Sequence, residues 1–170
     1  MSAIFNLILA VSLVYGLIDG VRTGFLTSVI ILADWCVSIY IAGLFYKPLS
    51  DLLTSFLFKE WREFLNFMAF TIIFTIPFGV ITQLTNVVGG PQGNLPYWQP
   101  HAPLSRLGGA FLGIISAAIG NGLTVMWLSV FHWDWLDELI KDAALVKPCM
   151  DLVQSLAFLL PTELRWWTQI

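Results

Sequence analysis

Long runs of apolar residues dominate the sequence, and polar residues are confined to the shorter stretches between them. Four such blocks cover residues 3–18, 25–46, 64–88 and 107–131. A helix needs roughly 20 residues, rising about 1.5 Å each, to cross a hydrocarbon core about 30 Å thick. The last three blocks reach that length and the first is slightly shorter. The pattern predicts an all-α membrane protein with four transmembrane helices.

The first two predicted helices are joined by a very short segment. Residues 19–23 separate them, and Gly16, Gly20 and Gly24 are small residues that suit a close turn and close helix contact. We therefore expect a tight hairpin. The first block carries no Lys or Arg at its start, so it lacks the charged region of a secretory signal, and we expect a retained helix.

The two other connections differ in character. Residues 47–63 are rich in charge, whereas residues 89–103 are dense in Gly and Pro, which disfavours regular structure. Tyr97 and Trp98 in the second connection favour a loop at the lipid headgroups, and a re-entrant loop is the alternative.

The C-terminal part reads as an amphipathic helical tail. Leu136, Leu139, Ile140, Ala143 and Ala144 recur at helical spacing opposite a charged face. This pattern predicts a helix on the membrane surface or on partner protein. We divide the chain into a transmembrane domain, residues 1–131, and an interfacial tail, residues 132–170.

Charge asymmetry predicts the orientation. With four spans, one side carries six cationic residues and the other carries Arg22 and Arg106; the six are Lys47, Lys59, Arg62, Lys141, Lys147 and Arg165. Cytoplasmic loops are enriched in Lys and Arg, so both termini are expected in the cytoplasm. Tryptophans at the predicted boundaries agree with these spans: Trp61, Trp98, Trp133, Trp135, Trp166 and Trp167.

The composition and the absence of known motifs argue against several classes of function. Hydrophobic residues make up 58% of the chain, charged residues 11%, and the formal net charge is −3. Such a chain offers no basic surface for nucleic acid. No P-loop, HExxH or nucleophile elbow occurs, the cysteines form no CxxC pair, and the two histidines lie near different faces. We expect no catalytic centre, cofactor or metal.

Small residues at four-residue spacing predict close helix packing. Gly109, Gly113 and Ala117 form one stripe in the last apolar block, and Ser12, Gly16 and Gly20 form another in the first. Small residues let helix backbones approach in lipid, where no hydrophobic effect drives association. The two stripes are expected to pack on each other; the alternative is separate neighbours or a second copy of the protein.

Asp34 is the ionisable residue predicted nearest the bilayer midplane. Such a group is by default a functional hypothesis, as in proton relays, although a carboxyl bonded to a neighbouring helix is the structural alternative. Ser116 is predicted at the same depth, with Asn121 and Gln83 as further polar candidates.

Two stretches resemble the colicin V production (CvpA) family over roughly residues 4–130. One is Leu17-Ile-Asp-Gly-Val-Arg22-Thr-Gly24-Phe25, followed by Trp35, Ala42, Tyr46, Pro48 and Leu49; the other is Arg106-Leu-Gly-Gly109-Ala-Phe-Leu-Gly113. Where many members carry charged residues, this chain has Asn6, Thr27-Ser28 and Ser116. The resemblance implies a bacterial inner-membrane protein connected with colicin V production or export.

We therefore expect a non-enzymatic accessory protein whose partners are the bilayer and other membrane proteins or itself. The alternative is a small transporter or channel with Asp34 facing the pathway. An intramembrane enzyme would need a second ionisable partner at the depth of Asp34, and the sequence offers none.

Overall fold

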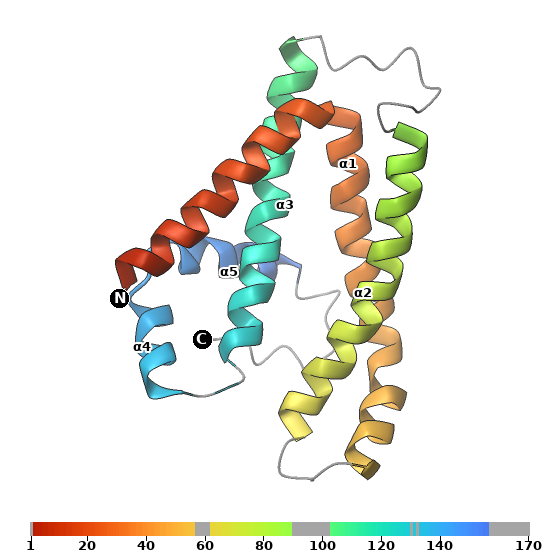
Figure 1. Ribbon diagram of the computed structural model, residues 1–170, viewed down its shortest axis with the longest axis vertical. Helices are drawn as coiled ribbons and strands as arrows, with labels where there is room; N and C mark the ends of the chain where they lie inside the picture. Colours follow the sequence, from red (N-terminus) through yellow and green to blue (C-terminus); the bar gives the residue numbers. More distant parts are fainter. Residues whose placement is uncertain (1, 57–61, 90–102, 130, 132, 157–170) are drawn as a thin grey trace.

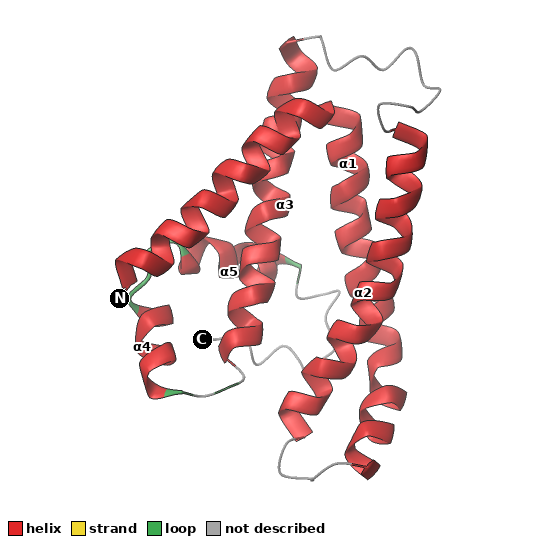
Figure 2. Cartoon of the chain, viewed as in Figure 1, coloured by secondary structure: helices red, strands yellow, loops and turns green. Residues whose placement is uncertain are grey.

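The described part of the chain is helical throughout, apart from short connections. The computed structural model describes residues 2–56, 62–89, 103–129, 131 and 133–156. The helices are α1 (Ser2–Phe56), α2 (Arg62–Gly89), α3 (Pro103–Ser129), α4 (Asp134–Lys141) and α5 (Val146–Ser155), as Figures 1 and 2 show. The all-α class is confirmed. The loop over residues 90–102 and the end of the tail, including Trp166 and Trp167, lie outside the described residues.

The first two apolar blocks form the single helix α1, which bends sharply at one residue. Gly24 has φ 79° and ψ 173°, a backbone conformation essentially restricted to glycine. The two arms, residues 2–23 and 25–56, form a V that opens away from this bend (Figure 1). At about 1.5 Å per residue they are about 33 and 48 Å long. The expected turn over residues 19–23 is wrong, because those residues are helical and Gly24 alone redirects the chain.

α1 also continues well past the predicted end of the second block. It passes through Pro48 and ends at Phe56, so the first part of the predicted connection is helical. Proline removes one backbone donor, but Leu49 and Leu53 beyond it still pack against the core. The Ser50 hydroxyl also donates a hydrogen bond to Oδ1 of Asn66 in α2. Packing against α2 therefore outweighs the local cost of the proline.

α3 and α2 pack against different parts of α1. α3 contacts α1 extensively, and α2 packs on the second arm through an aromatic group. The Trp35 ring lies 5.5 Å from that of Phe74 and 4.9 Å from that of Phe78, measured between centroids. Both phenylalanines flank Pro77, through which α2 continues. The core therefore lies along α1, where α3 and α2 pack against it.

The tail folds back onto the protein as two short helices. α4 and α5 are separated by a break after Lys141, so one continuous amphipathic helix is not formed. Leu136, Ile140 and Val153 belong to the same core cluster as residues of α1, α2 and α3. The backbone N–H of Leu145 donates to Oδ1 of Asn6 over 3.0 Å. The buried apolar residues of α4 and α5 are therefore covered by this protein's own helices.

Three of the described helices are long and apolar enough to span a membrane. They are Ser2–Ser55, Phe64–Leu84 and Pro103–Ser129. Their outward faces carry large apolar side chains, among them Leu7, Val11 and Tyr15 on α1 and Ile76 on α2. A membrane protein of this type exposes apolar groups to lipid rather than to water.

Candidate functional site

The bend of α1 is held by hydrogen bonds that involve neighbouring hydroxyl groups. The Ser28 hydroxyl donates to the Gly24 carbonyl over 2.9 Å, and that of Thr23 donates to the Asp19 carbonyl over 2.9 Å. The Phe25 N–H donates to the Ser105 hydroxyl at the start of α3, over 3.2 Å. The Phe25 bond satisfies a backbone donor that the break leaves without an intrahelical partner, and the two hydroxyl bonds are added within the turns on either side.

The two arginine–glycine segments meet at this bend, although the sequence separates them by some eighty residues. Besides the Phe25–Ser105 bond, the Ser28 hydroxyl lies 3.4 Å from the Gly109 carbonyl. A Cβ on Gly108 would lie 2.7 Å from Cδ2 of the Phe25 ring. The side chains of Arg22 and Arg106 are exposed at the same end of the molecule. The segments therefore form one junction, which we call the motif junction (residues 20–28 with 105–113).

The small-residue stripes lie against each other below the motif junction. A Cβ on Gly16 would lie 2.5 Å from Cβ of Ala117 and 2.6 Å from the Gly113 carbonyl oxygen. A Cβ on Gly20 would collide with the Gly109 carbonyl, and one on Gly113 with the Gly16 carbonyl. The backbones of α1 and α3 thus touch directly, a contact that only residues without large side chains permit.

Asp34 is buried in the second arm of α1 and is bonded through both carboxylate oxygens. The Ser38 hydroxyl, one turn further on, donates to Oδ1 over 3.0 Å, and the Thr82 hydroxyl of α2 donates to Oδ2 over 3.0 Å. The side chain is only 3% exposed. Asp34 therefore links α1 to α2, and both of its oxygens are occupied by neutral donors.

The other polar candidates are divided between two places. Ser116 is buried in α3, and its hydroxyl has no hydrogen-bond partner within the described part of the chain. Asn121 donates from Nδ2 to the Leu9 carbonyl over 3.4 Å and also bonds the Cys149 thiol. Gln83 is exposed. The structure thus brings Asn121 to the first arm of α1 and to α5, away from the Asp34 bonds.

Comparison with protein families identifies the chain. The model of the family described as "Colicin V production protein" matches residues 5–154. The chain belongs to this family. The match extends beyond α3 through α4 and most of α5, so the colicin V production family pattern includes the part of the tail that packs on the core. Comparison with curated proteins and with solved structures gave no match.

Several residues that shape this colicin V production family member were not singled out from the sequence. Ser105 and Thr82 bond across helices, and Ser28 and Asn6 were noted only as departures from the family's charged residues. Ser28 reaches α3 and Asn6 reaches the tail, so both take part in tertiary contacts. The sequence held one signal for the hydrogen bonds of Ser28 and Ser38: each serine lies four residues, about one helical turn, after the residue that accepts its bond. Among the described residues no group of three or more His, Cys, Asp or Glu could hold a metal ion.

Proposed function

We propose that this protein spans the bacterial inner membrane four times, with both termini in the cytoplasm. The bend at Gly24 supports this arrangement, because α1 would be far too long for one crossing, whereas each arm matches or exceeds a bilayer core of about 30 Å. The exposed Arg22 and Arg106 both lie at the motif junction, whereas in this arrangement the other cationic residues of the described helices belong to the opposite side: Lys47, Arg62, Lys141 and Lys147. That distribution favours a cytoplasmic location for the tail.

Within that membrane, the proposed role is that of a non-enzymatic accessory protein in toxin production or export, or in envelope function. Family membership carries the toxin connection. The observation that carries the accessory role is the bonding of Asp34: both oxygens already accept hydrogen bonds from Ser38 and Thr82. A carboxylate used in this way fixes the relative position of two helices. The exposed apolar faces of the helices are available to lipid, to other membrane proteins or to a second copy of this protein.

Complementation in a colicin V-producing strain tests the role. Deleting the gene should lower colicin V release, and the wild-type chain should restore it. Asp34→Asn keeps the shape of the side chain and one carbonyl acceptor, so the accessory role predicts restored release. Ser38→Ala removes a donor to the same carboxylate and serves as the matched control.

The transport alternative makes the opposite prediction. Asp34→Asn would then fail to restore release, and reconstituted liposomes would show a solute or proton flux that disappears in this variant and persists in Ser38→Ala. That pair of results would overturn the accessory role. Reporter fusions at the N-terminus and after residue 56, which flank α1, test the topology separately: reporters on opposite sides of the membrane would mean a single crossing by α1 and would refute four crossings.

A further inference from the structure

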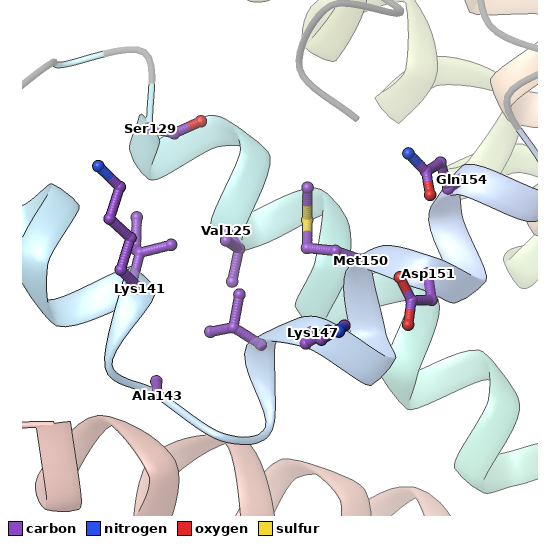
Figure 3. Close-up of a pocket in the computed structure, with 10 residues that line it drawn as sticks. Val125, Ser129, Lys141, Ala143, Lys147, Met150, Asp151 and Gln154 are labelled. Carbon is purple, nitrogen blue, oxygen red and sulfur yellow. The ribbon is translucent and has the colours of Figure 1, made fainter. Parts of the chain in front are cut away.

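A cavity lies where the end of α3 meets the two short helices. It measures about 340 Å³ and lies between α3, α4 and α5, as the close-up in Figure 3 shows. This volume is within the range of small-molecule sites, which begins at about 300 Å³. The cavity is not part of the motif junction, and the bonds of Asp34 do not reach it.

The walls and the rim of the cavity differ in chemistry. Val125 of α3, Ile140 of α4, and Val146 and Met150 of α5 are buried apolar residues of the lining. The rim is polar and exposed, and it comprises Lys141, Lys147, Asp151 and Gln154. Figure 3 shows Lys141 and Lys147 among the lining residues, Lys141 from α4 and Lys147 from α5. Two ammonium groups and one carboxylate leave the rim with a net positive charge.

The position of the cavity along α3 places it at the level of lipid headgroups. α3 enters the apolar region after the exposed Arg106, and 20 residues at about 1.5 Å each carry it about 30 Å, to the neighbourhood of Val125. Trp133 and Trp135 follow, both exposed and with rings stacked 5.7 Å apart. Exposed tryptophans are typical of the membrane interface. The cavity opening therefore lies where phosphate groups of lipids are found.

We propose that this cavity binds an anionic phospholipid whose headgroup carries free hydroxyl groups, the phosphatidylglycerol class. The ammonium groups of Lys141 and Lys147 pair with the phosphodiester, since lysines beside the membrane attract anionic lipid. The Asp151 carboxylate accepts a hydrogen bond from a headgroup hydroxyl. The apolar walls receive the glycerol backbone and the first acyl carbons. A bound lipid of this kind joins α4 and α5 to α3 at the cytoplasmic surface.

Lipid-dependent thermal unfolding of the full-length protein in mild detergent tests the proposal. Phosphatidylglycerol should raise the unfolding temperature at concentrations about 30-fold below those needed with phosphatidylcholine, the ratio expected from two lysines near a phosphate. Phosphatidylethanolamine, which carries no net charge, should resemble phosphatidylcholine. Soluble glycerol phosphate, which has the headgroup chemistry without acyl chains, should give no comparable shift.

Three variants locate the effect. Lys141→Gln with Lys147→Gln should reduce the 30-fold preference to about threefold or less, whereas Lys141→Arg with Lys147→Arg should retain it. Lys47→Gln, which removes an exposed lysine outside the cavity, is the matched control and should behave as wild type. All of these lysines are exposed, so folding should be preserved, and circular dichroism checks this.

The proposal is overturned if wild-type protein responds equally to phosphatidylglycerol and phosphatidylcholine, or if the double glutamine variant keeps the full preference. Equal stabilisation by glycerol phosphate would indicate a site for soluble phosphate and would overturn the lipid assignment. Because the readout is lipid-dependent stability, failure of the accessory role in colicin V release leaves this result unaffected, and the reverse also holds.

Discussion

A single added methyl group at Gly113 should weaken the contact between α1 and α3. In Gly113→Ala the Cβ would collide with the Gly16 carbonyl oxygen and lie 3.0 Å from Cα of Gly20. Both neighbours are backbone atoms, so the helices must separate by about 1 Å, and a gap of that size forfeits a quarter to a half of each dispersion contact. Overpacking of this kind costs about 1–3 kcal/mol, and the better helix propensity of alanine returns at most about 1 kcal/mol.

Two other glycines provide controls for the same substitution. A Cβ on Gly79 in α2 would meet nothing within 4 Å, so Gly79→Ala should leave stability unchanged or raise it slightly. Gly108→Ala would press only on the Phe25 ring, at 2.7 Å, and a side chain can shift, so its effect should be intermediate. The free energy of unfolding, measured by titrating SDS into mild detergent micelles, should fall by about 1–2 kcal/mol for Gly113→Ala. If Gly113→Ala and Gly79→Ala unfold at the same SDS fraction, the close backbone contact is refuted.

Three further outcomes follow from the same structure. Gly24→Ala forces a side chain into a conformation with φ 79° and should cost about 1–3 kcal/mol in the same titration; no loss would mean that the chain bends elsewhere. Asn6→Ala removes the acceptor for the Leu145 N–H and should speed proteolysis within α4 and α5, whereas Asn6→Asp keeps an acceptor and should not. Burial raises the pKa of the Cys149 thiol above its ordinary 9.0, against the lowering effect of the Asn121 hydrogen bond. The neutral thiol therefore stabilises the fold fully below pH 9.0, and this contribution is lost as the pH rises through the higher folded-state pKa. Maleimide should modify Cys149 far more slowly in the folded protein than in the SDS-unfolded protein. Equal rates would contradict the burial of this thiol.

Features that depend on local pattern could be predicted from the sequence. Uninterrupted apolar blocks were sufficient to predict the all-α class, because a membrane helix needs only length and apolar character. Glycine spacing in α1 and α3 was sufficient to suggest which faces meet, because few residues tolerate backbone contact. Family resemblance was visible because two of its glycines are required by the backbone: Gly24 has a positive φ, and a Cβ on Gly109 would collide with the Gly20 carbonyl.

Features that depend on register between helices could not be predicted. No residue near Thr82 in the sequence shows that Thr82 faces Asp34. Predicting that pair requires knowing how α1 and α2 are aligned along their axes. The packing of α4 and α5 on the other helices could not be predicted, because an amphipathic helix has the same sequence pattern whether it covers lipid or protein. The extension of α1 through Pro48 was missed for a related reason: packing against α2, which the sequence does not display, outweighs the local signal.

Three polar groups inside the apolar helices share a property that bears on the choice between accessory protein and transporter. Ser28 reaches the Gly109 carbonyl, Asp34 accepts from Thr82, and Asn121 reaches the Leu9 carbonyl, so each links α1 to another helix. Apolar contacts in lipid discriminate poorly between neighbours, whereas a polar pair, worth about 0.6–2 kcal/mol, specifies one register. Together the pairs fix both arms of α1. For Asp34 to serve a pathway, its carboxylate would have to leave two hydroxyl donors during each cycle, so restored colicin V release by Asp34→Asn is the outcome that this arrangement predicts.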